Sequence, residues 1–297
     1  MLRSVTAKAP ASTMLFGEHS ILRKGRAVVA AIDCWVSVNI STRTDDRIEI
    51  FSCLGNTSTS IHKIQVGPSF RFIQSALERF SPDCGMTIKI SSDIDPTLGL
   101  GSSASVTVAS LLALATLFEQ NWDQAKLLHE SIQLIHTVQG HGSGADAASI
   151  IYGGVIAFHP LQVEPLRPSL PITLLYSGTK TPTPEVISFV TEQEKAFPLV
   201  FDHLFAAIDQ TTEVAIKALI RDDFPLCGKM MNRADALMQA LGVGTADLSD
   251  LCWKLRYAPT IYGAKISGSG LGDSVVGLGT FPSSIPSTVT AKGAYVL

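Results

Sequence analysis

The sequence predicts an α+β fold with two domains, and three observations lead to this expectation. Strand-like segments rich in β-branched residues occur in both halves of the chain. Segments whose apolar residues recur at helical spacing follow these strands in each half, which is typical of α+β proteins. The chain has 297 residues, of which 46% are hydrophobic and 16% charged, enough for about two domains with packed cores.

The first half of the chain alternates between the two kinds of segment. Runs such as RAVVAAIDCWVSVNI carry the β-branched residues of a strand, whereas DQAKLLHESIQLIHTV has the apolar spacing of an amphipathic helix that Asp123 caps. The expected strands are 26–40, 47–51 and 86–94, and the expected helices are 67–80, 103–118 and 123–138.

The second half begins after a proline-containing stretch, LQVEPLRPSLP at 161–171, where we place the domain boundary. We therefore expect an N-terminal domain at 1–165 and a C-terminal domain at 166–297. Beyond the boundary, the pattern predicts a strand at 172–178, helices at 183–195, 199–221, 224–241 and 246–256, and a last strand and turn within 263–279.

Composition excludes several classes of protein. The formal net charge is −3 with no long run of Lys or Arg, which argues against a nucleic-acid partner. The five cysteines are scattered and form no CxxC pair, so neither a disulfide scaffold nor a zinc site is expected. The longest apolar run, 106–118, is shorter than the ~20 residues of a membrane span, and we recognise no signal peptide. We expect a cytoplasmic protein.

A glycine-rich turn, Gly99 to Ala104, joins an expected strand to the apolar helix 103–118. It satisfies the G-x-G-x-x-A pattern of dinucleotide-binding folds, but the acid at the required count, Glu119, follows an unbroken helix rather than a second strand. A Walker A loop is excluded because no lysine follows the glycines. The helix start instead presents backbone N–H groups and a positive dipole end, which suits an anion such as a phosphate. A plain glycine turn with a serine cap is the structural alternative.

Three separated motifs then identify a family. They are APASTMLFGEH at 9–19, GLGSSA at 99–104 and KISGSGLGDS at 265–274. In this order they resemble the GHMP kinase superfamily over essentially the full chain. The first motif, followed by GRAVVAAI at 25–32, is most similar to the mevalonate kinase family. The resemblance implies ATP-dependent phosphorylation of the primary hydroxyl of mevalonate, a step of isoprenoid biosynthesis.

The resemblance also implies a fold and a site. The expected fold has a ribosomal-protein-S5-like N-terminal domain and a ferredoxin-like C-terminal domain, with ATP and Mg²⁺ between them. Asp146 would accept or orient the proton of the acceptor hydroxyl, with Ser12 beside it, and Ser103 would supply a hydroxyl on the magnesium side. The implied phosphate loop comprises Gly99, Leu100, Gly101, Ser102, Ser103 and Ala104, and the implied acceptor pocket comprises Glu18, His19, Ser143, Gly268 and Ser269. Many relatives are dimers, so a homodimer is expected.

The sequence departs from the family pattern at two positions. Ser12 replaces a lysine that would stabilise the acceptor alkoxide, with Lys180 or Lys265 as candidate substitutes, and Ile135 replaces a glutamate that would bind magnesium. These departures leave open a catalytically weakened homologue that acts as a sensor or scaffold. A second alternative is a phosphomevalonate kinase or another small-molecule kinase of the superfamily. The stretch 138–154 favours this alternative, and His141, Lys180 and Arg23 would then hold the phosphate of the acceptor.

Overall fold

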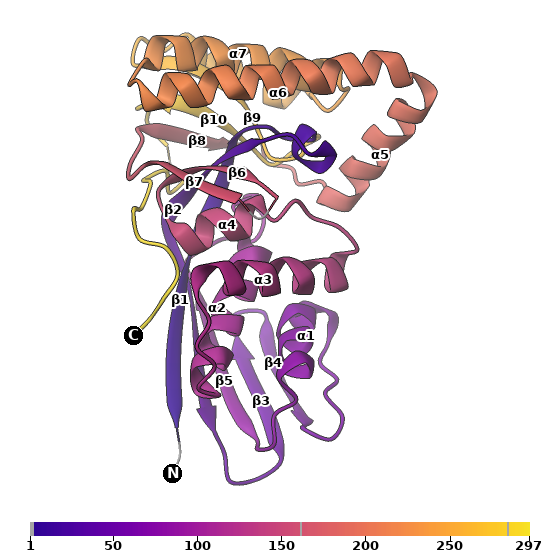
Figure 1. Ribbon diagram of the computed structural model, residues 1–297, viewed down its shortest axis with the longest axis vertical. Coiled ribbons are helices and arrows are strands. Elements are labelled where there is room, and N and C mark those ends of the chain that lie inside the picture. Colours follow the sequence, from indigo (N-terminus) through magenta and orange to yellow (C-terminus); the bar gives the residue numbers. More distant parts are fainter. Residues whose placement is uncertain (1–2, 161, 284) are drawn as a thin grey trace.

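Two sheets with helices packed against them form the protein, as seen in the computed structural model, which describes residues 3–160, 162–283 and 285–297 (Figure 1). This architecture confirms the expected α+β class. The larger sheet has eight strands in the order β11-β1-β2-β5-β3-β4, with β6 beside β2 and β7 beside β6. Its strands are β1 Ser4–Phe16, β2 Ala27–Thr42, β3 Arg47–Ser52, β4 Gly55–Ser60, β5 Met86–Ser92, β6 Val155–His159, β7 Gln162–Arg167 and β11 Tyr295–Val296.

Helices of the first half cover one face of this sheet (Figure 1). The central helix α2 is apolar on all sides, as expected of a helix enclosed by a sheet and by other helices. The expected cap of α3 is confirmed, because the Asp123 carboxylate accepts a hydrogen bond from the Lys126 N–H at 2.7 Å. These elements are η2 Pro68–Phe70, α1 Arg71–Phe80, α2 Ser102–Leu117, α3 Gln124–Gln139 and α4 Ala145–Tyr152, whereas η1 Ser20–Arg23 lies against α6 Pro198–Ile220.

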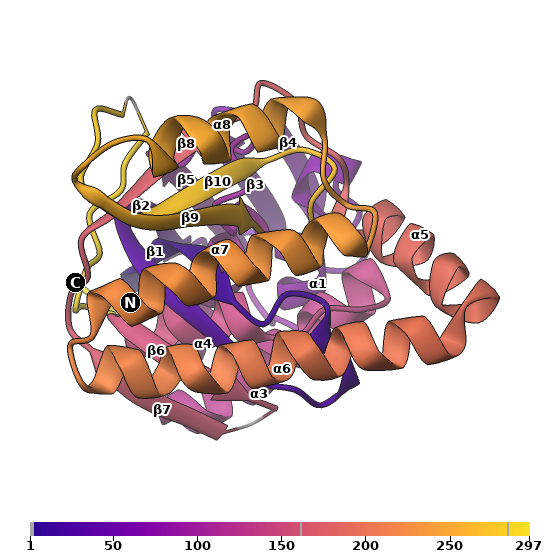
Figure 2. The ribbon, with the colours of Figure 1, turned by 90° about the horizontal axis from the view of Figure 1, so that it is seen from above.

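The smaller sheet has three antiparallel strands in the order β8-β10-β9. Seen from above, α8 lies on one side of this sheet and α7 on the other, with α6 beyond α7 (Figure 2). Proline occupies the first turn of α5, α6 and α7, where its missing N–H costs no helical hydrogen bond. The elements are β8 Ile172–Tyr176, α5 Thr183–Ala196, α6 Pro198–Ile220, α7 Phe224–Ala240, α8 Ala246–Arg256, β9 Ile261–Ser267 and β10 Ser274–Gly279.

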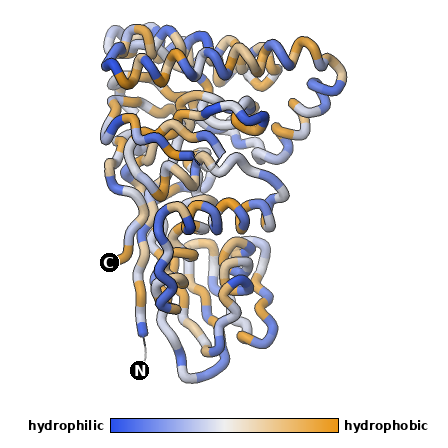
Figure 3. The backbone as a smooth tube through the Cα atoms, viewed as in Figure 1, coloured by the Kyte–Doolittle hydropathy of each residue, from blue (hydrophilic) through white to orange (hydrophobic). Residues whose placement is uncertain are grey.

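Apolar side chains form two clusters, and the larger one includes residues of both sheets. The larger cluster lies between the first sheet and α1 to α4 and extends to one side of α6 and α7. The smaller cluster lies among α5, α6, α8 and the second sheet. Hydrophobic and hydrophilic segments alternate along α6 and α7, as expected of helices that bury only one side (Figure 3). None of the described helices is long and apolar enough to cross a membrane.

Seven described elements lie outside the ranges expected from the sequence: β1, η1, β4, α4, β6, β7 and β11. β7 lies inside the stretch 161–171, of which residue 161 is outside the described residues, and it pairs with β6. Pro165 is compatible with this strand because a proline without an N–H is tolerated at a sheet edge. The chain passes from the first sheet to the second between Arg167 and Ile172.

The C-terminal segment returns to the first sheet. Val289 forms a bridge with Ile32, and Val296 of β11 pairs with Ala7 of β1. Residues from the second half therefore complete the sheet of the first half. The division into domains at 1–165 and 166–297 stays a prediction.

Strand β1 changes its register with β2 twice, between Pro10 and Ala11 and between Met14 and Phe16. Irregularities of this kind re-aim side chains and are frequent beside functional sites. Ser12 lies between the two shifts and donates its backbone N–H to the Leu100 carbonyl at 3.1 Å. The bulged strand is thus tied directly to the turn that precedes α2.

A buried acid on α7 holds the strand that leads to the late glycine-rich motif. The Asp235 carboxylate accepts hydrogen bonds from Arg256 Nη2 of α8 at 2.7 Å and from the Ile266 N–H of β9 at 3.2 Å. Removing one partner of a buried ion pair leaves the other charge uncompensated. Asp235 therefore fixes β9 between α7 and α8.

We predict that Asp235→Ala lowers the free energy of unfolding by roughly 3 kcal/mol, because the largely buried Arg256 guanidinium loses its ion-pair partner and the Ile266 N–H loses its acceptor. Chemical denaturation followed by circular dichroism measures this change. Glu119→Ala is the control, since it breaks an exposed pair with Arg3 and should cost less than about 1 kcal/mol. A loss of under 1 kcal/mol for Asp235→Ala would contradict the assigned role.

Candidate active site

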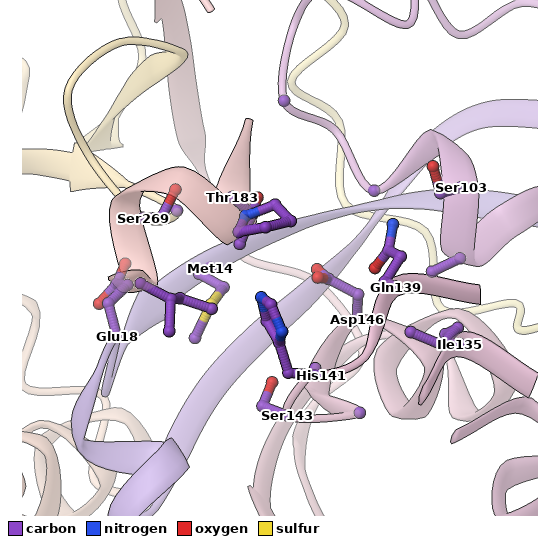
Figure 4. Close-up of a pocket in the computed structure, with 18 of the residues that line it drawn as sticks. Met14, Glu18, Ser103, Ile135, Gln139, His141, Ser143, Asp146, Thr183 and Ser269 are labelled. Carbon is purple, nitrogen blue, oxygen red and sulfur yellow. The ribbon is translucent and has the colours of Figure 1, made fainter. Parts of the chain in front are cut away.

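A cavity of about 370 Å³ lies where the two halves of the chain meet. Its lining comes from the end of β1 and η1, the start of α2, the α3–α4 connection, α5 and the β9–β10 connection. In the view of Figure 4, Asp146 lies between His141 and Gln139, with Ser103 toward one end and Glu18 and Ser269 toward the other. A volume of this size suits a small-molecule ligand.

The glycine turn, which we define as Gly99 to Gly101, presents an open helix start to this cavity. Gly99 and Gly101 have φ of 71° and 66°, in the left-handed region that favours glycine. No side chain of the described residues caps α2 at Gly101, and the first helical bond runs from the Ser105 N–H to the Gly101 carbonyl. The N–H groups of the first turn, from Ser102 onward, therefore remain available to an anion.

Ser12 connects the glycine turn to Asp146. Its hydroxyl is fully buried and donates a hydrogen bond to Asp146 Oδ1 at 2.7 Å. A Cβ placed on Gly101 would lie 2.0 Å from Ser12 Oγ, so only glycine fits opposite this serine. The Ser105 hydroxyl of α2 also donates to the Pro10 carbonyl of β1 at 2.7 Å. β1, α2 and the first turn of α4 thus meet at one point.

Burial raises the pKa of Asp146, the hydrogen bond from Ser12 opposes this effect, and the negative charge of Glu18 adds to it. Among the described residues, no lysine or arginine forms an ion pair with Asp146. The carboxylate is therefore held by a hydroxyl and lacks the neighbouring cation that the family pattern implies. A raised pKa is typical of a group that takes up a proton during a reaction.

The three cations considered for the site, Lys265, Lys180 and Arg23, form no ion pair with Asp146. Lys265 is fully buried on β9, where its ammonium contacts the Glu18 carboxylate and the Ile266 carbonyl. Lys180 lines the cavity and donates to the Pro96 carbonyl. Arg23 pairs with Glu194 of α5, with Nε 2.9 Å from Oε1. Of these three cations, Lys180 alone lines the cavity.

His19 joins the first motif to the late glycine turn, which we define as Gly268 to Gly272. Its Nε2–H donates to the Ser269 carbonyl at 2.9 Å, and the residue has a φ of 62°. Burial lowers the pKa of His19, which favours the neutral ring. The Thr13 and Ser267 hydroxyls hydrogen bond at 2.9 Å beneath this contact. The first and third sequence motifs are therefore in direct contact.

Three buried polar atoms that line the cavity have no partner among the described residues: His141 Nε2, Ser269 Oγ and Asp273 Oδ1. Buried polar atoms in native proteins are nearly always hydrogen-bonded, so such atoms around one cavity indicate a polar ligand. His141 comes from the α3–α4 connection, and Ser269 and Asp273 come from the β9–β10 connection.

Most of the predicted site residues come together in this cavity. Gly99, Gly101, Ser102, Ser103, Ala104, Glu18, His19, Ser143, Asp146, Gly268 and Ser269 all line it. Two do not: Ser12 lies buried behind Asp146, and Leu100 points into the core and offers only its backbone. The roles assigned to these residues stay predictions.

The sequence analysis did not include Asp273 among the site residues, although it lines the cavity. Its place as an acid inside the late glycine-rich motif could have indicated it. The sequence analysis also did not predict where Lys180 lies relative to the cavity. Ile135 lines the cavity with an apolar side chain, as the sequence indicated. Glu130, the nearest acid on α3, points elsewhere and pairs with Arg79 and with Lys126. No group of three or more potential metal-binding side chains occurs among the residues that the structure describes.

Comparison with known proteins agrees with the fold and with the motifs. Two family models match the chain, GHMP kinases N terminal domain over residues 70–154 and GHMP kinases C terminal over residues 215–285. A mevalonate kinase of Thermococcus sibiricus is 30% identical in an alignment that covers 92% of this chain and 89% of that protein. The chain therefore belongs to the GHMP kinase family, and it is similar to mevalonate kinases over nearly its whole length.

Solved structures support the fold. L. major mevalonate kinase in complex with R-mevalonate has a TM-score of 0.76 and 24% identity, covering 93% of this chain and 87% of that chain. Lactococcus lactis galactokinase complexed with galactose has a TM-score of 0.83 and 17% identity, covering 99% and 95%. Because kinases with different acceptors match equally well, the fold alone does not select the acceptor.

We predict that Asp146→Asn raises the melting temperature at pH 8 by roughly 2–4 °C, the shift expected from about 1 kcal/mol. The pKa of Asp146 is raised in the folded state, so its cost to stability is fully present above that pKa. The cost disappears as the pH falls below about 3.9, the ordinary aspartate pKa. Thermal melts at a series of pH values measure the difference between variant and wild type.

Asp95→Asn is the matched control for this experiment. Asp95 is exposed, and hydrogen bonds from Thr97 lower its pKa, so the same substitution there should not stabilise the protein at pH 8. An Asp146→Asn variant that melts below wild type at pH 8 would contradict the predicted cost of burying this carboxylate.

Proposed function

We propose that this chain catalyses the ATP-dependent phosphorylation of the primary hydroxyl of mevalonate, giving 5-phosphomevalonate and ADP. The observation that carries the proposal is that the Asp146 carboxylate and the uncapped start of α2 face the same cavity. The match to a mevalonate kinase over 92% of the chain supports this choice of acceptor.

The triphosphate of ATP would bind at the glycine turn. Amide N–H groups at the start of α2 and the positive end of the helix dipole suit the β- and γ-phosphates. Ser102 and Ser103 line the cavity beside these amides and add hydroxyl groups. Phosphoryl transfer depends mainly on positioning and charge neutralisation, which an arrangement of this kind supplies.

The acceptor would occupy the part of the cavity lined by Glu18, His19, Ser143, Gly268 and Ser269. Mevalonate carries a carboxylate and two hydroxyls, so it needs several polar partners. The unpartnered His141 Nε2 and Ser269 Oγ are suited to such groups. The apolar side chains of Met14 and Ile187, which also line the cavity, would contact its carbon chain.

Asp146 would accept the proton of the attacking hydroxyl. Its raised pKa makes the carboxylate a stronger base than an exposed aspartate, and Ser12 fixes its orientation through Oδ1. The hydroxyl oxygen then forms the new bond to the γ-phosphorus, the bond to the bridging oxygen breaks, and ADP leaves. This assignment uses no lysine at position 12.

Magnesium is implied by kinase chemistry, and the oxygen donors around the glycine turn fit it. Mg²⁺ prefers oxygen ligands and takes several of them from phosphates and water, so a dedicated protein cage is not needed. We assign Ser103 Oγ to the magnesium side of the site. When bound, the ion would neutralise charge on the β- and γ-phosphates. A homodimer remains part of the proposal without a contact to support it.

The phosphomevalonate alternative lacks a supporting observation. A phosphorylated acceptor needs a second cationic patch. Of the three residues considered for it, His141 and Lys180 line the cavity, but Arg23 is paired with Glu194 and does not. The weakened-homologue alternative rests on Ser12 and Ile135. The same assay decides among all three.

An ADP-release assay with mevalonate, phosphomevalonate, galactose or no acceptor tests the proposal. We expect turnover with mevalonate well above the ATP-only background. Asp146→Asn should lower this rate by roughly 100-fold or more while leaving the affinity for a non-hydrolysable ATP analogue nearly unchanged. Asp95→Asn, which lies outside the cavity, should keep the wild-type rate.

Two outcomes would contradict the proposal. If no acceptor raises turnover above background, the chain is not a kinase of these alcohols. If phosphomevalonate is used and mevalonate is not, the alternative acceptor replaces the proposed one.

A further inference from the structure

Asp273 lies at the end of the β9–β10 connection, immediately before β10. Its backbone is held on both sides, because its N–H donates to the Thr179 carbonyl at 2.8 Å and its carbonyl accepts from the Ser177 N–H at 2.9 Å. The residue has a φ of 64°, a left-handed conformation that aspartate tolerates better than most residues. These contacts fix where its side chain points.

The Asp273 side chain packs directly on the glycine turn. A Cβ placed on Gly99 would lie 2.9 Å from both Cβ and Cγ of Asp273, so the carboxyl group contacts the backbone of Gly99 itself. The next residue, Ser274, donates its hydroxyl to the Leu98 carbonyl at 2.9 Å. The late motif and the glycine turn are therefore in contact at the position of this acid.

The carboxyl group is buried and incompletely paired. Asp273 is only 6% exposed, and its Oδ1 has no hydrogen-bond partner among the described residues, although it lines the cavity. Burial raises the pKa of Asp273 to about 6, against the opposing positive charge of Lys180. A buried carboxylate without a partner is costly, which indicates that a ligand completes this site.

An acid beside a phosphate site has a clear electrostatic consequence. A carboxylate in contact with the glycine turn repels a triphosphate bound there, unless a cation lies between the two. Mg²⁺ in nucleotide sites is bound by one or two carboxylates together with phosphate oxygens. Asp273 meets this requirement, whereas a bare anion site would be better served by an uncharged residue.

The other acids near the cavity are already occupied. Asp146 accepts the Ser12 hydrogen bond, Glu18 contacts Lys265, and Glu130 pairs with Arg79 and Lys126 away from the cavity. In the family pattern a glutamate binds the metal. The corresponding position in this chain holds the apolar Ile135. Asp273 is therefore the acid that the geometry leaves available beside the glycine turn.

We infer that Asp273 supplies the protein carboxylate that binds the magnesium ion of the nucleotide, in place of the carboxylate that is missing at Ile135. This inference rests on the proposed function, because it requires that ATP binds at the glycine turn. It moves the metal-binding acid from α3 to the late glycine-rich motif. Ser103 Oγ would be the second protein group on the same ion.

The test measures binding rather than turnover. Calorimetry gives the affinity of the non-hydrolysable analogue AMPPNP with Mg²⁺ and with EDTA, for wild type, Asp273→Asn and Asp95→Asn. Mn²⁺ bound with AMPPNP, followed by electron paramagnetic resonance, reports the metal directly. In wild type we expect Mg²⁺ to tighten AMPPNP binding by roughly tenfold or more.

In Asp273→Asn this gain should fall to about threefold or less, since the asparagine no longer repels metal-free AMPPNP and attracts the ion less. The variant should melt no lower than wild type because it loses a costly buried carboxylate. Asp95→Asn, with its side chain outside the cavity, should keep the wild-type gain.

The outcomes separate the two proposals. If wild type binds AMPPNP and Asp273→Asn keeps the full magnesium gain and the wild-type Mn²⁺ signal, the inference about Asp273 is overturned and the proposed function stands. If wild type does not bind AMPPNP under either condition, both proposals fall together.

Discussion

The hydrogen bond from Ser12 Oγ to Asp146 Oδ1 is the contact on which the geometry of the site depends. Ser12 lies on the irregular part of β1, its N–H is bonded to the Leu100 carbonyl, and its hydroxyl occupies the space next to the missing Cβ of Gly101. One small residue thus positions both the carboxylate and the turn before α2. The space between the Asp146 carboxylate and the glycine turn holds only a hydroxyl group, so a longer side chain at position 12 would not fit there.

The charges around the cavity are the second constraint on what it can bind. Two buried carboxyl groups, Asp146 and Asp273, have raised pKa values, and the nearby lysine of β9, Lys265, is occupied by Glu18. Lys180 is the single lysine or arginine among the described residues that line the cavity, so the cavity has little positive charge of its own. Binding of a nucleotide together with magnesium would supply that charge at Asp273, while Asp146 would take up the proton of the acceptor. Asp273 Oδ1 would then gain the partner that it lacks among the described residues.

The sequence predicted the long helices well because their periodicity reflects burial on one side. The four helices of the second half begin and end within one or two residues of their expected positions. The short elements were missed: α4 begins in glycine-rich sequence, and β7 and β11 are defined by pairing with distant strands rather than by local pattern. The motifs predicted most residues of the cavity. Asp273 was missed because its meaning comes from contact with Gly99, which is 174 positions earlier in the chain.

The pH dependence of kcat/KM in Ser12→Ala, compared with wild type, tests the central contact most directly. The hydrogen bond from Ser12 lowers the pKa of Asp146, so its loss raises that pKa and reduces the fraction of carboxylate at a given pH. The account predicts that the acid limb of the profile moves to higher pH in the variant, while the affinity for AMPPNP changes little. An acid limb that stays in place or moves to lower pH would contradict it.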